Sequence, residues 1–250
     1  MKKYLAQLQD PDPSVRQNAA RALGKMGPAA ATPKVLRALV QRLREDEIWW
    51  VREAAAHALG KMGKVAATPE VLRALTERLR QDEGWSVRGA AAGALSAMGK
   101  AAAQKEVLQA LAERLRKDEA PEVRRAAAET LEAMGEVAAR PEVIQALAQR
   151  LREDEDMWVR RAAVWALEAM GAVAPREVLQ ALAQCLREDR TEWVREAAAW
   201  ALGRMGPAVA RPEVLQALVQ CLREDKDEWV RKAAAWALEE MGLAAATLLE

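Results

Sequence analysis

The chain has 250 residues, of which 51% are hydrophobic and 30% charged, a composition typical of soluble helical proteins. Lys and Arg number 38 against 37 Asp and Glu, so the net charge of +1 provides no positive field that would attract nucleic acid. No run of about 18 apolar residues exists, and the start MKKYLAQLQD is basic without an apolar centre. We therefore expect a cytoplasmic protein that binds neither nucleic acid nor membrane.

Met-Gly pairs recur along the chain and define a repeat. Their methionines are 36 residues apart, and 35 apart once because of a deletion near Ala174. A period of this length is typical of stacked helical hairpins. We predict one domain, 1–250, with an N-terminal capping hairpin at 1–33 and repeats at 34–69, 70–105, 106–141, 142–176, 177–212 and 213–250.

The first helix of most repeats begins at or beside a proline, as at Pro141, because proline suits the first helical turn. Ile144, Leu147 and Leu151 follow at intervals of three and four residues. This spacing predicts a buried stripe on one side of the helix.

The second helix follows an acidic turn. In the repeat around residue 160, the Asp154 carboxylate can accept hydrogen bonds from free amides of the turn, and Gly171 suits a left-handed helix end. Between them lie small and apolar residues at helical spacing, which would let neighbouring helices pack closely. These residues are Val159, Ala163, Ala166 and Met170.

Every repeat also carries an Asp in its turn and an Arg six residues later. The pairs are Asp10/Arg16, Asp46/Arg52, Asp82/Arg88, Asp118/Arg124, Asp154/Arg160, Asp189/Arg195 and Asp225/Arg231. With this motif, the chain resembles the HEAT-like repeat family over nearly its whole length. Its repeats are similar to those of bilin lyases, to those that accompany bacterial signalling ATPases, and to artificial alpha-repeat libraries built from such sequences.

This resemblance implies an all-α, right-handed α-solenoid of about seven hairpins that serves as a protein-binding scaffold. It also implies that the Asp and Arg residues form a ladder between adjacent hairpins. The second helices of such a solenoid line its concave side.

Tryptophans recur at particular positions of the second helices. At about 100° per residue, Trp158, Arg161 and Trp165 share a stripe away from the buried one, and so lie on the side that the resemblance makes concave. The same three positions in the other complete repeats read Trp50-Glu53-His57, Ser86-Gly89-Gly93, Glu122-Arg125-Glu129, Trp193-Glu196-Trp200 and Trp229-Lys232-Trp236. We predict a partner-binding surface of Trp50, Glu53, His57, Arg125, Trp158, Arg161, Trp165, Trp193, Glu196, Trp200, Trp229, Lys232 and Trp236.

Three interpretations of the tryptophans are open at this stage. Six indoles on neighbouring helices exceed the apolar patch of an ordinary soluble monomer, which favours the anchoring of a protein or peptide. The rings could instead stack on one another and on Arg or Lys stems without a ligand. The third interpretation is self-association into a homodimer through the same patch.

Catalytic motifs are missing from the sequence. His57 is the only histidine, so the chain alone supplies neither a histidine-based metal cluster nor a Ser-His-Asp triad. The His-Glu motifs of HEAT-like iron enzymes are absent, and nothing beyond the repeat supports bilin-lyase activity. Cys185 and Cys221 occur in the same phrase, QCLRED, at positions too far apart for a disulfide. We predict a non-enzymatic protein with free thiols, no metal and no cofactor.

Overall fold

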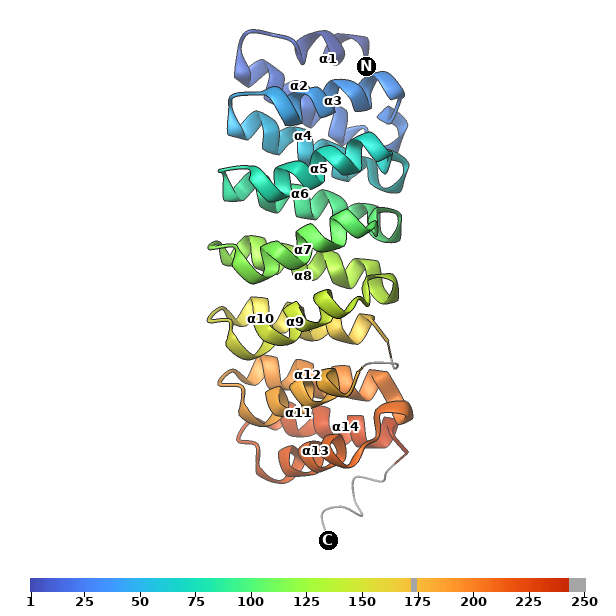
Figure 1. The fold of residues 1–250 in the computed structure, drawn as a ribbon, viewed down its shortest axis with the longest axis vertical. Helices are drawn as coiled ribbons and strands as arrows, with labels where there is room; N and C mark the ends of the chain where they lie inside the picture. Colours follow the sequence, from blue (N-terminus) through green and yellow to red (C-terminus); the bar gives the residue numbers. More distant parts are fainter. Residues whose placement is uncertain (172–174, 243–250) are drawn as a thin grey trace. The chain divides into compact units, whose positions relative to one another are not determined.

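The computed structural model describes residues 1–171 and 175–242. Within these ranges the chain forms fourteen α-helices and five short 3-10 helices (Figure 1). The all-helical fold of repeated hairpins predicted from the sequence is confirmed. The deletion near Ala174 and the part of the last predicted repeat beyond Gly242 lie outside the described residues.

The chain divides into two compact units, Met1–Met134 and Gly135–Glu250, called here the N-terminal and C-terminal units. The N-terminal unit contains α1 (Lys2–Gln7), α2 (Pro13–Lys25), α3 (Pro33–Glu45), α4 (Trp49–Met62), α5 (Pro69–Gln81), α6 (Trp85–Met98), α7 (Lys105–Lys117) and α8 (Pro121–Met134). The C-terminal unit contains α9 (Pro141–Glu153), α10 (Met157–Ala169), α11 (Arg176–Glu188), α12 (Glu192–Met205), α13 (Pro212–Glu224) and α14 (Glu228–Glu240).

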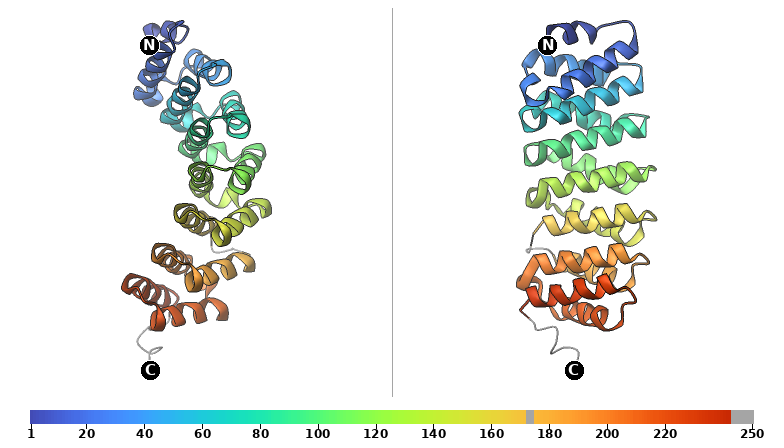
Figure 2. Two further views of the ribbon diagram at one scale, coloured as in Figure 1. Left: turned by 90° about the vertical axis from the view of Figure 1, so that its left-hand side faces the viewer. Right: turned by 180° about the vertical axis from the view of Figure 1, so that it is seen from behind.

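Each unit consists of two rows of packed helices (Figure 2). In the N-terminal unit the second helices α2, α4, α6 and α8 form one row, and the first helices α3, α5 and α7 form the other. The C-terminal unit repeats this plan with α10, α12 and α14 beside α9, α11 and α13. The core lies between the rows and is built mainly from Val, Leu and Ala of both rows.

Small residues set the spacing of the second helices. Ala54, Ala55 and Ala58 of α4 are at most 3% exposed, and Gly60 lies so close to α6 that an added Cβ would sit 3.0 Å from the Cα of Ala94. Side chains this small allow backbones to approach at interior packing density. The contact between neighbouring second helices is therefore made by these small residues and not by the exposed positions of the helices.

The helix ends follow local rules. Thr32 and Thr68 accept from the amides of Val35 and Val71 at the starts of α3 and α5. Asp154 ends α9 and accepts from the amide of Asp156, while Asp156 itself is the N-cap of α10. Gly171 has a φ of 95°, in the left-handed region expected for a helix end.

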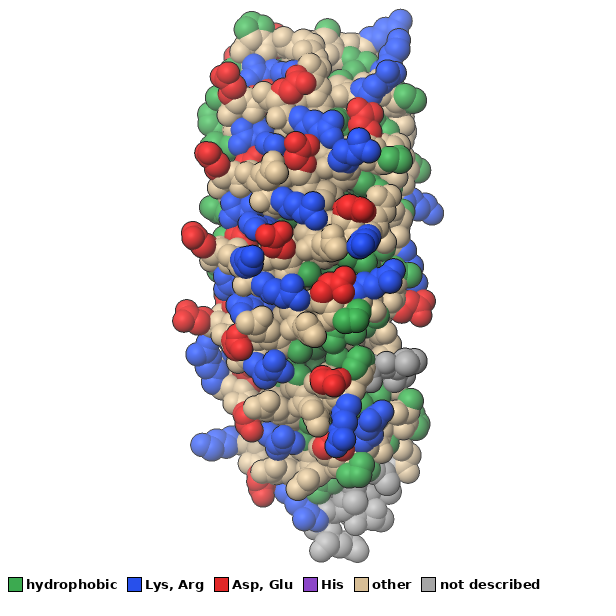
Figure 3. All heavy atoms as spheres, in the orientation of Figure 1, with side chains coloured by type: hydrophobic (Ala, Val, Ile, Leu, Met, Phe, Trp, Pro, Cys, Tyr) green, Lys and Arg blue, Asp and Glu red, His purple; other side chains and the backbone are tan. Residues whose placement is uncertain are grey.

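The surfaces of both units carry charges of either sign. Lys or Arg and Asp or Glu side chains are interspersed on the face seen in Figure 3. None of the described helices has the length and apolar character needed to cross a membrane.

Candidate functional site

Arg–Asp pairs join neighbouring hairpins inside each unit. Arg16 donates from Nε and Nη2 to the Asp46 carboxylate at 2.7 and 2.9 Å, and from Nη1 to the carbonyl of Asp10 at 2.9 Å. Each such arginine thus ties its own turn to the next hairpin. The same two-pronged contact links Arg52 to Asp82, Arg88 to Asp118, Arg160 to Asp189 and Arg195 to Asp225.

The ladder arginines Arg124 and Arg231 also brace their own turns. Each donates from Nη1 to two backbone carbonyls of its own turn. The acceptors are Asp118 and Glu119 for Arg124, at 2.9 and 3.0 Å, and Asp225 and Lys226 for Arg231, at 2.7 and 3.1 Å. Within residues 1–171 and 175–242 no hairpin follows that of Arg231.

The electrostatics of the Arg–Asp pairs favour both charged forms. Burial opposes ionisation of Asp46, but hydrogen bonds from Arg16 and the Ile48 amide outweigh it and hold the Asp46 pKa below its usual value. Asp225 behaves in the same way beside Arg195, so that its pKa is also lowered. Because the Arg and Asp charges of each pair neutralise one another, the paired residues serve to hold neighbouring hairpins together.

None of the nine tryptophans is buried. In the C-terminal unit Trp158, Trp193 and Trp229 are 42%, 50% and 65% exposed, and the other three are partly exposed. All six belong to the second helices α10, α12 and α14. We call the surface formed by Trp158, Arg161, Trp165, Trp193, Glu196, Trp200, Trp229, Lys232 and Trp236 the indole surface.

Four of these rings meet in pairs on the central helix, α12. Trp158 of α10 contacts Trp193 edge to face, with centroids 6.5 Å apart and planes at 67°. Trp236 of α14 lies against Trp200 with centroids 4.3 Å apart and planes at 42°. Trp193 and Trp200 are two helical turns apart, so one ring pair lies toward each end of α12.

Glu196 lies on α12 between the two ring pairs, three residues after Trp193 and four before Trp200. Its carboxylate accepts from Trp200 Nε1 at 3.3 Å. The neighbouring Glu192 accepts from Trp193 Nε1 at 3.0 Å. Indole N–H groups therefore orient toward the carboxylates of their own helix, which fixes how the rings are presented.

Gly203 makes room for one of the ring pairs. A Cβ added there would lie 2.4 Å from Trp236 Cζ3 and 2.9 Å from the Ala237 Cα. Contacts this short with ring and backbone atoms are not tolerated, so a larger residue would push Trp236 away from Trp200. Glycine at this position is thus a positioning residue for the indole surface.

Cations of the same chain cover some of the outer rings. Lys232 Nζ lies 4.7 Å from the centroid of Trp229 and 2.7 Å from a Glu228 oxygen, and this contact lowers the Glu228 pKa. Arg161 Cζ lies 5.7 Å from the centroid of Trp158. The self-stacking that the sequence left open is therefore present, yet it leaves the rings accessible.

Sequence reasoning missed three residues of this surface: Glu192, Gly203 and Glu228. The phrase Glu-Trp-Val-Arg, which occurs in both α12 and α14, contained the signal for Glu192 and Glu228. Gly203 gave no comparable signal, because Gly60 occupies the same register without any nearby tryptophan ring.

The remaining predicted binding residues lie in the N-terminal unit. Trp50 packs edge to face against Trp49 with centroids 5.7 Å apart, while Glu53 is half-buried and His57 exposed. Arg125 forms an exposed ion pair of 3.4 Å with Glu129. No aromatic pair in the described part of this unit joins two neighbouring second helices.

The cysteines occupy a register that holds arginine in earlier repeats. Arg42 Nη1 lies 3.4 Å from its own turn carboxylate, Asp46, and Arg150 stands at the same register of α9. Cys185 and Cys221 replace this arginine in α11 and α13, and both are buried free thiols. Burial, followed by the nearby Asp225 charge, raises the pKa of Cys221 to about 12.

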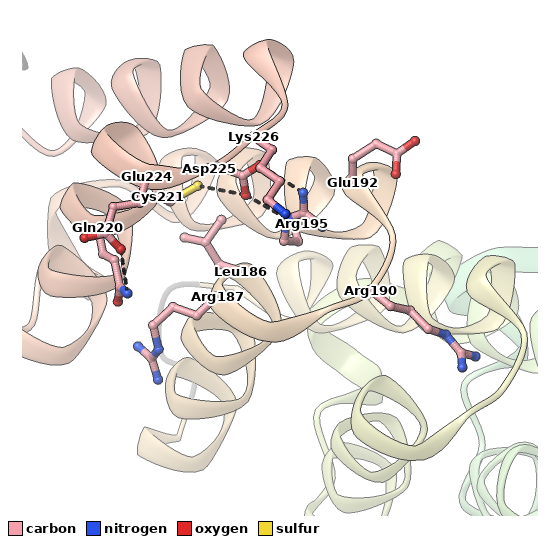
Figure 4. Close-up of a pocket in the computed structure, with 10 residues that line it drawn as sticks. All are labelled: Leu186, Arg187, Arg190, Glu192, Arg195, Gln220, Cys221, Glu224, Asp225 and Lys226. Carbon is pink, nitrogen blue, oxygen red and sulfur yellow. Dashed lines mark hydrogen bonds and ion pairs between the residues drawn. The ribbon is translucent and has the colours of Figure 1, made fainter.

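Cavities open at both cysteine positions. One of about 460 Å³ is lined by ten residues of α11, α12, α13 and their turns, including Arg195, Cys221 and Asp225 (Figure 4). A second, of about 150 Å³, is lined in part by Cys185 and Asp189. Neither is lined by a tryptophan, and Glu192 is the residue that the larger cavity shares with the edge of the indole surface.

Comparisons with known proteins bear on the fold. A family model described as HEAT repeats matches residues 1–96, 72–168 and 165–239. A structure of importin beta has a TM-score of 0.72 at 17% identity, covering 98% of this chain and 37% of that one. The karyopherin Kap121p bound to the extreme C-terminus of the protein phosphatase Cdc14p has a TM-score of 0.69 at 18% identity, covering 99% of this chain and 29% of that one.

A further similar structure is the complex of CpcE and CpcF of phycocyanin lyase from Nostoc sp. PCC7120. Its TM-score is 0.51 at 24% identity, covering 99% of this chain and 91% of that one. No curated protein sequence gives a significant match. At these identities the structural likenesses concern the fold alone, and the chain spans less than two fifths of either karyopherin-type chain.

Proposed function

The chain belongs to the HEAT-repeat family, and from that premise we propose that it is a non-catalytic scaffold whose indole surface binds a protein or peptide segment. The single observation that supports this role most strongly is that three adjacent second helices carry six indoles, three of them exposed and three partly exposed. Trp229 alone remains 65% exposed. When a partner covers these rings, their apolar surface is removed from water, and this burial favours binding.

The arrangement is also preorganised. Ring pairs on α12 and indole-to-carboxylate hydrogen bonds restrict the rotamers of Trp193 and Trp200 before any partner arrives. Because these side chains have few rotatable bonds, ordering them on binding costs little entropy. The similar fold of Kap121p is bound in its structure to the extreme C-terminus of another protein, which agrees with this mode of use.

The proposal can be tested with a phage-displayed library of random peptides panned on the immobilised chain. Peptides should be enriched on the unmodified chain and lost on the double variant Trp165→Ala/Trp200→Ala. The matched control is Trp49→Ala/Trp85→Ala, which removes two exposed tryptophans of the N-terminal unit and should retain the peptides. Absence of enrichment, or equal retention by both double variants, would exclude the indole surface as the binding site.

Self-association through the indole surface is the competing outcome. It predicts a dimer at tens of micromolar that becomes monomeric in Trp165→Ala/Trp200→Ala, and light scattering on both proteins distinguishes it from peptide binding. A monomer in both cases removes a strong homodimer from consideration.

A further inference from the structure

The second-helix face of the C-terminal unit has an excess of negative charge. Apart from Arg160 and Arg195, which pair with Asp189 and Asp225, its three helices carry six carboxylates and four cations. The carboxylates are Glu168, Glu192, Glu196, Glu228, Glu239 and Glu240, and the cations are Arg161, Arg204, Arg231 and Lys232. A partner that covers the indoles would therefore encounter an acidic surround and gain from carrying positive charge.

The existing cations are not available to Glu196. Arg204 pairs with Glu168 at 3.3 Å, Lys232 pairs with Glu228 at 2.7 Å, and Arg161 lies over Trp158. Among the described residues, the Glu196 carboxylate accepts its side-chain hydrogen bond from Trp200 Nε1, at 3.3 Å. This neutral donor leaves most of the carboxylate's acceptor capacity unused.

The rings beside Glu196 also lack a cation. Within the described residues, the cations recorded over indole rings are Arg161 at Trp158 and Lys232 at Trp229. Neither Trp193 nor the Trp200/Trp236 pair has such a partner. A carboxylate without a cationic partner, placed between indole rings, can bind a planar cation in two ways. The carboxylate pairs with the positive charge, and the indole rings stack on the flat face of the cation.

We propose that Glu196, with Trp193 on one side and the Trp200/Trp236 pair on the other, forms a subsite for an arginine side chain of the bound segment. Arginine fits better than lysine because its planar guanidinium stacks on indole and can donate two hydrogen bonds to one carboxylate. The chain already places one guanidinium, that of Arg161, against an indole ring of the same surface. This inference rests on the proposed function, since it specifies the partner that the indole surface binds.

The subsite can be tested without a natural partner by a titration of the full-length, ¹⁵N-labelled chain. The probes are N-acetylarginine amide and its neutral isostere N-acetylcitrulline amide, and the readout is the set of indole N–H signals in NMR spectra. Single Trp→Phe substitutions assign these signals. We expect the arginine probe to shift the Trp193 and Trp200 signals with an affinity about tenfold higher than that of the citrulline probe.

Two variants make the test specific. Glu196→Gln keeps an oxygen acceptor for Trp200 Nε1 but removes the charge, and should bring the ratio of the two affinities close to one. Glu53→Gln removes a carboxylate at the same register in the N-terminal unit, where the flanking residues are Trp50 and His57, and should leave the ratio unchanged. A circular dichroism spectrum and a melting curve of each variant establish that the fold is kept.

Three results overturn the subsite: equal response to both probes, shifts confined to tryptophans outside α12 and α14, or an unchanged ratio in Glu196→Gln. The outcome is separate from that of the peptide panning. Peptides lost on Trp165→Ala/Trp200→Ala but equally bound by Glu196→Gln would leave the proposed function intact and exclude the arginine subsite. An arginine-selective response without any enriched peptide would support the arginine subsite and exclude the proposed binding of a peptide segment.

Discussion

The second helices of the two units share one packing scheme and differ in what they expose. In α4 of the N-terminal unit and α12 of the C-terminal unit, the same registers supply buried Val and Ala and the same arginine reaches the turn of the next hairpin. At the registers outside the core, α4 has the half-buried Glu53 and the exposed His57, whereas α12 has the half-buried Glu196 and Trp200. Stability and recognition are thus assigned to different residues of one helix, so each can be changed while the other is kept.

The largest effect should follow from breaking the ladder. Arg160→Ala leaves the Asp189 carboxylate, which is 6% exposed, without its two guanidinium hydrogen bonds. Removing one partner of a buried pair typically costs about 3 kcal/mol or more in the free energy of unfolding. Urea denaturation should show this loss, and Arg52→Ala should match it if both units use the ladder alike. A loss under about 1 kcal/mol in both would contradict the structural role assigned to the ladder.

Two glycines of the second helices should respond in opposite directions. Gly203→Ala places a Cβ 2.4 Å from Trp236 and should destabilise the fold by about 1–3 kcal/mol while altering tryptophan fluorescence. Gly89→Ala meets nothing within 4 Å and should stabilise the N-terminal unit by up to about 1 kcal/mol, because alanine favours helix. Melting curves of the two variants test this directly, and effects of the same sign would be inconsistent with the packing described.

Acid should weaken the ladder in a defined direction. The pKa values of Asp46 and Asp225 are lower in the folded chain than in the unfolded one, so their contribution to stability is complete above the ordinary Asp pKa of about 3.9. It is lost as the pH falls through the lowered folded-state values. Unfolding free energies measured from pH 6 to pH 3 should decline, less steeply in Asp46→Asn than in the exposed control Glu47→Gln. A constant or rising stability toward pH 3 would refute the lowered pKa values.

The smallest expected effect concerns the reactivity of Cys185 and Cys221, which stand at the register of Arg42 and Arg150. With a pKa of about 12, Cys221 is a thiolate in on the order of one molecule in ten thousand at pH 8. A thiol-specific chromogenic reagent should therefore react far more slowly with the folded chain than with the chain in urea. Fast reaction of both thiols under native conditions would show that the cavity beside Cys221 gives more access than the structure indicates.

The sequence predicted the repeat because the local rules for helix starts and ends agree with the 36-residue period at most hairpins. Helix starts at prolines, left-handed glycine ends and a small-residue stripe are all short-range features, and the structure contains each of them. The position of Trp158 and Trp165 outside the core followed from angular spacing alone. Residue types at fixed registers were thus sufficient to predict the fold and the exposed stripe.

The ladder motif shows where this local reasoning ends. Asp and Arg recur in every repeat, but a link between hairpins also needs a following hairpin whose carboxylate the arginine can reach. Arg231 carries the motif in the last described hairpin and contacts the carbonyls of its own turn. The motif alone is therefore sufficient for the brace within a turn, whereas the link depends also on the next hairpin.

The pairing of rings across helices was not predictable from residue types at fixed registers. Whether Trp236 leans toward Trp200 depends on its rotamer, on the distance between α12 and α14 and on the absence of a side chain at Gly203. The same holds for the cap of α10, where Asp154 and Asp156 are both suitable acceptors and the backbone geometry decides which one begins the helix. Such features arise from packing between elements, which periodicity does not encode.

The central claim is that the indole surface binds a partner while contributing little to the fold. The most direct test measures two quantities on Trp165→Ala/Trp200→Ala: its affinity for a peptide selected on the unmodified chain, and its free energy of unfolding in urea. We predict an affinity at least about tenfold weaker, with unfolding changed far less than by Arg160→Ala. Full affinity, or a collapse of the fold in this variant, would contradict the claim.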